Sequence, residues 1–308
     1  MQMTYGATRS GIALMMTLFF IIAVTVILGI SLSQIKSAQS QLEAERFLVQ
    51  SALTLEDVTT ILQNSGSFGD VNDTASLDLF LGMAGAVPLE TERFHGLFTL
   101  KSARGRININ TLADSNSSAL RDAMTRYLSD ARFQLQDPAY LVELLSDCMG
   151  GEQEVYRTDI FQELPWLYRE RITDATHLGH ILDYYARERR DGAVYQVPWK
   201  ELLRFGSRDD KALNANYLTP EVWLLLEPTL AGDQVEGLTD GTTLYESAAD
   251  IPLPAETVQR LETEFGLVYY TPEIDVTLTL RSPEDYHATI TFEYDMKTKK
   301  ARNFDYAI

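Results

Sequence analysis

Hydrophobic residues are concentrated in one long run near the start of the chain. There is no charged residue between Gly11 and Ile35, and residues 12–28 are almost wholly apolar. At a rise of about 1.5 Å per residue, a helix of about 20 such residues crosses the hydrocarbon core of a bilayer. A cleaved secretory signal has a shorter apolar part and a small-residue cleavage site after it. The run therefore predicts a transmembrane helix over residues 12–35.

The pattern changes after residue 35, but the predicted helix does not end there. Proline and glycine are absent from residues 31–64, so nothing in the sequence interrupts the helix. Apolar residues recur at helical spacing on one stripe: Ile35, Leu42, Val49 and Leu53. This spacing predicts an amphipathic continuation of the same helix over residues 36–65.

Further along the chain, the hydrophobic period separates strands from helices. Alternating apolar positions predict strands at four places: residues 95–102, 274–280, 287–294 and 303–308. Helical spacing predicts helices at four others: residues 118–131, 137–148, 177–188 and 197–205. Because the helices lie between the first strand and the last three, we expect an α+β fold in which an all-α domain is inserted into an antiparallel sheet.

Composition and charge narrow the classes of function. The 308 residues include 26 Lys and Arg against 44 Asp and Glu, and the net charge of −18 repels nucleic acid. The single cysteine, Cys148, excludes internal disulfides and thiolate metal clusters. Serine-hydrolase and nucleotide-binding motifs are absent. We therefore expect neither a nucleic acid partner nor enzymatic activity.

The first eleven residues form a hydrophilic leader that contains one positive charge and no acidic residue. Positive charge before the first span places this end of the chain in the cytoplasm and the rest across the membrane. A leader that ends in Gly11, followed by an apolar stretch that stays on the helix, resembles the class III signal peptides of type IV pilins and pseudopilins. The resemblance implies that a prepilin peptidase cleaves the chain between Gly11 and Ile12.

The residue at the fifth position after the implied cleavage site narrows the resemblance. Most members of the superfamily have a glutamate there, which neutralises the N-terminal ammonium of a neighbouring subunit, but this chain has Met16. An unpaired charge in a bilayer is costly, so a subunit without the carboxylate suits an end position of a filament. Together with the size of the chain, this resembles the K-type (GspK-like) minor pseudopilins of type II secretion systems.

Two Asn-x-Asn elements, each ahead of an expected helix, are a second point of resemblance. Asn108 and Asn110 lie in a segment starting at Gly105 that is similar to a signature of the K-type proteins, and Asn214 and Asn216 repeat the pattern. Asparagine tolerates tight turns, and its side chain satisfies free backbone N–H groups. We interpret these residues as structural turn and capping devices.

Together, the periodicity and the resemblance predict an order of segments for a pilin-like protein. These are a leader (1–11), a transmembrane helix (12–35), its periplasmic amphipathic half (36–65), the first part of the head (66–107), the inserted helical domain (108–230), and a linker with the C-terminal strands of the head (231–308).

The resemblance implies a minor pseudopilin at the tip of the pseudopilus, which helps to initiate pseudopilus assembly for protein export across the outer membrane. Such a protein is held in the inner membrane with its C-terminal domain in the periplasm. Its implied partners are the I- and J-type minor pseudopilins, which would pack on Leu42, Val49 and Leu53. Packing of this stripe on the chain's own sheet is an equal alternative. A minor pilin of a type IV pilus or of a DNA-uptake apparatus is the alternative function.

One acidic, glycine-containing stretch, residues 232–241, is expected to be a loop. Asp233, Glu236 and Asp240 supply the oxygen ligands that calcium prefers, and the resemblance to K-type proteins implies calcium on acidic loops of the head. Calcium is therefore a candidate cofactor, with a solvated turn as the alternative interpretation. His177 and His180 are interpreted as a packed or solvated pair rather than a metal site.

The leader assignment predicts the outcome of one substitution. Replacing Gly11 with a bulky residue, as in Gly11→Phe, is expected to leave an uncut precursor, because the peptidase no longer accepts the cleavage site. Mass spectrometry of the membrane-extracted chain measures this directly, in cells with and without the peptidase. A wild-type chain that begins at Met1 in both strains would contradict the assignment.

Overall fold

The computed structural model describes residues 39, 41–90, 94–114, 116–150 and 160–307. The expected leader, transmembrane helix and cleavage site lie outside these residues. Within them, no helix combines the length and the apolar character that crossing a bilayer requires.

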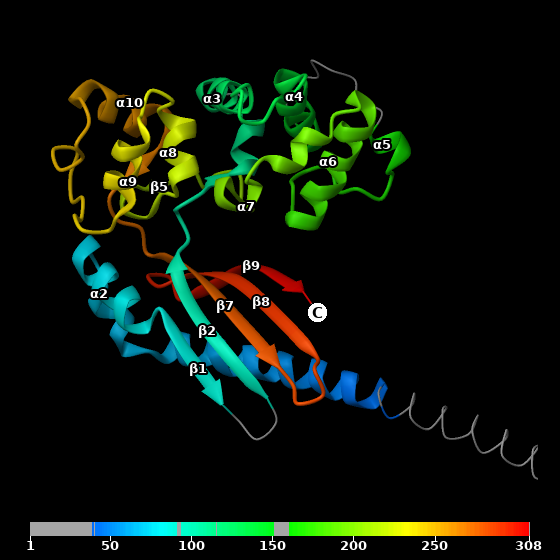
Figure 1. The fold of residues 1–308 in the computed structure, drawn as a ribbon. Coiled ribbons are helices and arrows are strands. Elements are labelled where there is room, and N and C mark those ends of the chain that lie inside the picture. Colours follow the sequence, from blue (N-terminus) through cyan, green and yellow to red (C-terminus); the bar gives the residue numbers. More distant parts are fainter. Residues whose placement is uncertain (1–38, 40, 91–93, 115, 151–159, 308) are drawn as a thin grey trace, which may run out of the picture.

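A five-stranded antiparallel sheet forms the head of the molecule, in the strand order β1-β2-β7-β8-β9 (Figure 1). The strands are β1 (Ala86–Glu90), β2 (His95–Ser102), β7 (Glu273–Arg281), β8 (His287–Asp295) and β9 (Lys300–Ala307). The pairing of Ser102 with Ile274 makes β2 and β7 direct neighbours, although 170 residues separate them in the sequence. The whole insert therefore starts and ends at one place on the sheet.

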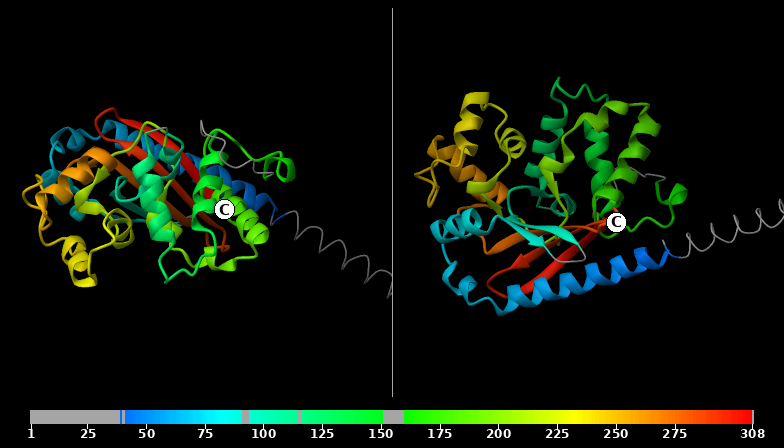
Figure 2. Two further views of the ribbon diagram at one scale, coloured as in Figure 1. Left: turned by 90° about the horizontal axis from the view of Figure 1, so that it is seen from above. Right: turned by 60° about the horizontal axis from the view of Figure 1, so that its bottom comes forward.

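The N-terminal helix, residues 41–64, packs along one face of this sheet (Figure 2). Its buried residues recur every three or four positions and form one stripe: Phe47, Ser51, Leu55, Val58 and Leu62. The apolar members of the stripe share a core with alternate residues of β7 and β8: Ile274, Val276, Leu278, Leu280, Ala288, Ile290, Phe292 and Tyr294. Burial of each large apolar side chain contributes about 1.5–3 kcal/mol, so this two-layer contact stabilises the head.

Two short helices join the N-terminal helix to the sheet, namely η1 (Gly66–Asp70) and α2 (Thr74–Ala84). Asp73 caps α2, because its carboxylate accepts a hydrogen bond from the Ser76 N–H at 2.8 Å. The hydrophobic pattern predicted neither α2 nor β1.

The insert occupies residues 103–272 and has its own hydrophobic core. Its helices are η2 (Ile109–Ala113), α3 (Ser118–Leu128), α4 (Pro138–Cys148), α5 (Ile160–Glu163), α6 (Ala175–Arg189), η3 (Gly192–Gln196), α7 (Trp199–Leu202), η4 (Ala215–Tyr217), α8 (Pro220–Leu226), α9 (Gly232–Thr239) and α10 (Ala255–Phe265). Two parallel strand pairs add to them: β3 (Ile107–Asn108) with β4 (Leu203–Arg204), and β5 (Leu213–Asn214) with β6 (Leu267–Val268).

The insert differs from the expected all-α domain over residues 108–230 in two respects. It includes short parallel strands, and it extends beyond residue 230, because α9 and α10 bury Val235, Leu238 and Leu261 in the same core as Trp223 of α8. Residues 232–239 thus form a helix and not the expected loop.

A buried cluster of charges joins the insert to the sheet. Arg104 follows β2 directly and is fully buried. Its Nη2 lies 2.8 Å from Asp210, 3.0 Å from Glu293 and 3.3 Å from Glu273. Arg204 also pairs with Asp210, at 3.0 Å. Because Asp210 belongs to the insert and both glutamates belong to the sheet, one guanidinium group ties the two parts together.

The ionisation of the two glutamates reflects their different positions around Arg104. Burial acts to raise the pKa of Glu293, but the hydrogen bond from Arg104 and the charges of Arg104, Arg204 and Arg302 outweigh it and hold this pKa below its ordinary value. At Glu273, burial outweighs the attraction of Arg104 and raises the pKa. Of the two glutamates, Glu293 is therefore the one whose ionised form the arginines stabilise more.

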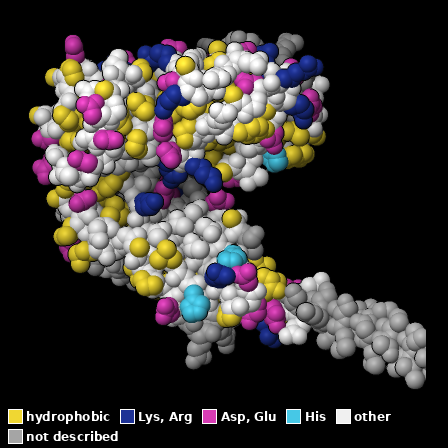
Figure 3. Space-filling model, viewed as in Figure 1, with side chains coloured by type: hydrophobic (Ala, Val, Ile, Leu, Met, Phe, Trp, Pro, Cys, Tyr) yellow, Lys and Arg dark blue, Asp and Glu magenta, His cyan; other side chains and the backbone are white. Residues whose placement is uncertain are grey.

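Away from this junction, the insert and the sheet separate. The space-filling view shows a hollow between them, with charged side chains along its inner border (Figure 3). The charge cluster, the 2.7 Å ion pair of Arg106 with Asp275 and the two adjacent chain crossings are thus among the contacts that orient the insert above the sheet.

The buried cluster predicts a large loss of stability when Arg104 is removed. Arg104→Gln is expected to lower the free energy of unfolding by about 3–5 kcal/mol, because the buried Glu293 and the half-buried Asp210 and Glu273 lose their shared partner. Urea unfolding of the detergent-solubilised chain, followed by fluorescence of the buried Trp223, measures the change. Arg187→Gln is the matched control, since Arg187 pairs with Glu163 on the surface and its loss is expected to cost at most about 1 kcal/mol. Equal effects of the two changes would contradict this account.

Candidate functional site

The stripe predicted from the sequence lies on the outer face of the N-terminal helix. At 100° per residue, Leu42, Val49 and Leu53 fall within a narrow arc, about half a turn from the residues that face the sheet. Their side chains are 47%, 60% and 54% exposed. Of the two interpretations left open by the sequence, packing on the chain's own sheet does not occur among the described residues. In the part of the chain that the structure describes, Leu42, Val49 and Leu53 thus form an apolar face without a partner.

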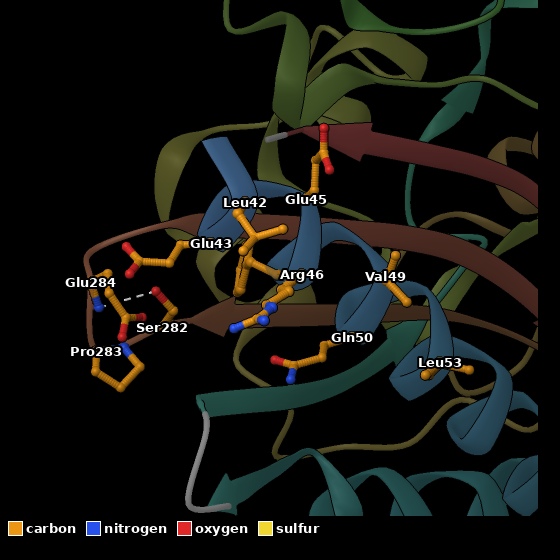
Figure 4. Close-up of a pocket in the computed structure, with 11 residues that line it drawn as sticks. Leu42, Glu43, Glu45, Arg46, Val49, Gln50, Leu53, Ser282, Pro283 and Glu284 are labelled. Atoms are coloured by element: carbon orange, nitrogen blue, oxygen red, sulfur yellow. Dashed lines mark hydrogen bonds between the residues drawn. The ribbon is translucent and has the colours of Figure 1, made fainter. Parts of the chain in front are cut away.

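This face forms one side of a groove that the β7–β8 hairpin completes (Figure 4). Ser282, Pro283 and Glu284 lie at the tip of the hairpin, beside the first turns of the helix. The helix lines the groove with Leu42, Glu43, Glu45, Arg46, Phe47, Val49, Gln50 and Leu53. Apolar side chains thus run along the groove, and charged groups border it.

An aromatic contact holds the hairpin against the helix, and other contacts fix the shape of the hairpin itself. The rings of Phe47 and Tyr286 stack with centroids 6.1 Å apart, and the Ser282 N–H donates a 2.9 Å hydrogen bond to the Tyr286 carbonyl. Beyond the tip, Arg281 binds Asp285 at 2.6 Å and lowers the pKa of this exposed carboxyl. The groove is therefore pre-formed in the isolated chain.

The composition of the groove favours binding over chemistry. Its lining includes no cysteine or histidine. Its row of Leu42, Val49 and Leu53 follows i, i+7, i+11 spacing, which places the three residues on one face of the helix, and one amphipathic helix packs along another through such a face. A second helix with an apolar stripe is the natural occupant.

The first Asn-x-Asn element holds distant loops of the insert together. The Asn110 amide donates to the carbonyls of Ile172 and Gly206 at 3.0 and 2.9 Å, and it accepts from the Ile172 N–H at 2.8 Å. The Asn108 carbonyl oxygen accepts from the Gly206 N–H at 3.0 Å, and its amide donates to the Ser207 carbonyl. Both side chains are buried and carry structural bonds only.

The second element repeats this arrangement in the other half of the insert. Asn214 accepts from the Asn216 N–H at 3.1 Å. Asn216 donates to the carbonyls of Tyr245 and Tyr269 and accepts from the Tyr245 N–H at 2.7 Å. In each pair, the first asparagine accepts from the N–H two residues further on, and the second fixes a remote segment. Asn108 also binds a remote segment itself, at residues 206 and 207.

The two elements lie back to back at Gly105. The Gly105 carbonyl accepts from the Thr219 N–H at 3.1 Å, and the Arg104 carbonyl accepts from the Asn214 N–H at 2.9 Å. A Cβ at position 105 would lie 2.2 Å from the Tyr217 carbonyl oxygen. Only glycine allows this close approach, which gives a steric reason for the first residue of the signature-like segment.

The acidic residues considered as calcium ligands do not form a cluster. Asp233 and Glu236 lie on the exposed surface of α9, and Asp240 accepts hydrogen bonds from the N–H and hydroxyl of Thr242 at 2.8 Å. Within the described ranges, no three histidine, cysteine or acidic side chains are placed to hold a metal ion.

Two other residues considered for chemistry are buried. Burial raises the pKa of Cys148 to about 12, so its thiol stays protonated at neutral pH. His177 packs in α6, where burial lowers its pKa and its Nδ1 accepts a 3.3 Å hydrogen bond from the Thr173 N–H.

The sequence pattern found the helix side of the groove and missed the hairpin side. Pro283 and Glu284 do lie between two alternating segments, which marks a turn. Nothing local indicates that this turn folds back against residues 42–47, because that contact joins segments about 240 positions apart.

The fold can be compared with known proteins. No family model matches the sequence, and no curated protein matches it. Among solved structures, the chain is similar to the crystal structure of the GspK-GspI-GspJ complex from the type 2 secretion system of enterotoxigenic Escherichia coli. The TM-score is 0.51 at 14% sequence identity, and the match covers 88% of this chain and 97% of the other. The expected resemblance is thus confirmed at the level of the fold: this chain has the fold of a GspK-like minor pseudopilin.

Proposed function

We propose that this protein is a non-enzymatic minor pseudopilin of a type II secretion system, located at the tip of the pseudopilus, where it helps to initiate assembly. The observation that carries the proposal is the pre-formed groove on the outer face of the N-terminal helix. The GspK-like fold supports the class of protein, and the groove supports a role that depends on contact with other subunits.

The groove explains why the helix carries two apolar stripes. One stripe, which includes Phe47, Leu55 and Val58, is used by the chain's own sheet. The other remains exposed at Leu42, Val49 and Leu53. Apolar residues of a helix are ordinarily buried in the functional state, so the second stripe suits the helices of neighbouring subunits. We infer that these are I- and J-type minor pseudopilins, because the similar solved structure is a complex of GspK with GspI and GspJ.

The sequence of the N-terminal segment supports the end position and the location. Met16 provides no carboxylate for the ammonium of a further subunit, which disfavours an internal position in a filament. The uncharged run over residues 12–35 and the leader ending at Gly11 support a single span of the inner membrane, cleavage by a prepilin peptidase, and a periplasmic head.

The proposal predicts that charge in the groove blocks assembly. Val49→Lys together with Leu53→Lys is expected to reduce co-purification of I- and J-type pseudopilins at least tenfold, because two apolar contacts are replaced by ammonium groups that must be desolvated. Affinity purification from solubilised membranes and quantitative immunoblotting measure the effect.

Ile61→Lys is the matched control, because Ile61 is an exposed apolar residue of the same helix outside the groove. It is expected to leave co-purification within twofold of the wild type. All three positions are exposed, so the urea unfolding midpoints of the variants should agree. Unchanged co-purification of the double variant would sink the assignment of the groove.

A further inference from the structure

The outer face of α6 presents a row of polar residues, and each holds a side chain from a flanking segment. His180, Asp183 and Arg187 are spaced so that they follow one side of the helix. Trp166 packs edge-on against His180, with ring centroids 4.8 Å apart and planes at 87°. On the next turn, the Tyr195 hydroxyl donates a 2.6 Å hydrogen bond to Asp183.

The third position of the row is held in the same way. Arg187 forms an ion pair with Glu163, which lies at the end of α5. The opposite side of α6 is buried in the insert through Leu178, Ile181, Leu182 and Tyr185. The α6 outer face is therefore a fixed surface on a well-anchored helix.

The two aromatic rings of this face are exposed although they are held in place. Trp166 is 62% and Tyr195 is 56% exposed. In the described part of the insert, the exposed large apolar residues are Trp166, Tyr168 and Tyr195, so all three are aromatic and fall within 30 positions. The hydrogen bond to Asp183 also raises the pKa of Tyr195. Exposed rings with fixed orientations lose little conformational entropy when a partner binds.

Charge is divided unequally over the insert. Residues 220–265 contain ten acidic residues and one basic residue, a net charge of −9. Residues 160–190 contain five of each, and all five cations are arginines. In Figure 3, Asp and Glu side chains gather over α9 and α10, whereas Lys and Arg side chains lie over the α4–α6 end. Residues 160–190 are thus neutral overall within a strongly acidic insert, and they repel an acidic partner less than α9 and α10 do.

Several of these arginines form no ion pair with the acidic residues that the structure describes. Among the described residues, Arg169, Arg171 and Arg190 are exposed and form no ion pair, although Arg169 lies over the ring of Phe161. Binding sites for proteins are enriched in Trp, Tyr and Arg and poor in Lys. No lysine occurs between residues 160 and 199, so the composition of this end matches that of an interface.

We propose that the α6 outer face binds an acidic surface of a partner protein, with Trp166 and Tyr195 as apolar anchors and the neighbouring arginines as partners for its carboxylates. This surface lies on the insert and not on the N-terminal helix. It is independent of the groove and of the subunits proposed to occupy it.

The test uses photo-crosslinking of the full-length chain in its own membranes. p-Benzoyl-phenylalanine replaces Tyr168 or Tyr195 in separate strains. Tyr306, an exposed aromatic residue of β9, serves as the control position, and Val49 reports on the groove. Positions 168 and 195 are expected to crosslink to the same protein, and position 306 is not. Mass spectrometry identifies the product.

Binding of the identified and purified protein is then measured against the full-length chain. Trp166→Ser and the charge reversal Arg171→Glu are each expected to weaken binding at least tenfold, and Tyr306→Ser is expected to change it less than twofold. Tyr168→Ser is a second variant, since its only described polar contact is with Glu170 at 2.6 Å. Equal unfolding midpoints show that the variants are folded.

Four outcomes would overturn the proposal. The first two are the absence of a crosslinked product at positions 168 and 195, and a product that is a second copy of this chain. The third is a product that periodate oxidation destroys, because the crosslinked partner is then a saccharide and not a protein. The fourth is a crosslinked protein whose binding is unchanged by Trp166→Ser and Arg171→Glu. A product at position 195 together with no product at position 49 would contradict the proposed function of the groove and would leave the proposal for the α6 outer face standing.

Discussion

The structure depends on a junction at which the chain leaves the sheet at the end of β2 and returns to it 170 residues later in the adjacent strand β7. Ser102 and Ile274 are paired, so the ends of the insert are separated by about the 4.8 Å between neighbouring strands. Two such crossings alone would leave the insert free to turn. Arg104 restrains it, because its buried charge contacts Asp210 from the insert and Glu273 and Glu293 from the sheet at the same time, and Arg106 adds an ion pair with Asp275 of the sheet. An orientation that separated Asp210 from Arg104 would remove the part of this buried cluster that comes from the insert, and so would weaken the pairing of a fully buried charge.

Much of the fold follows from periodicity where one face of an element is buried. The predicted strands at 95–102, 274–280 and 287–294 agree with β2, β7 and β8 within one residue at each end, because their alternate side chains face one core. The elements that were missed lack this signal. In α2, the apolar residues Leu79 and Met83 are exposed, and β1 contains Pro88. Helix α9 contains two glycines, and it is helical because Val235 and Leu238 reach the core. Helix α10 does carry a regular stripe of Val258, Leu261 and Phe265, and this signal was available in the sequence.

The candidate site was predictable only in part, for a geometric reason. Helical spacing identifies Leu42, Val49 and Leu53 as one stripe, but the same helix has a second stripe through Phe47 and Leu55, and periodicity does not tell which one meets the sheet. In the structure, the second stripe packs on the alternate side chains of β7 and β8 that face the core. The buried charge cluster has no local signal, since Arg104 and Glu293 lie 189 positions apart.

The two short parallel strand pairs of the insert have a consequence for how such a protein can evolve. β3 with β4 and β5 with β6 bring residues 107 and 203, and 213 and 267, side by side. Each pair closes a lobe of helices in the way that β2 and β7 close the whole insert, so the architecture is nested. The entropy of closing a loop grows only with the logarithm of its length. Helices can therefore be added to or deleted from either lobe while the register of the head stays intact, which leaves the bulk carried above the sheet open to evolutionary variation.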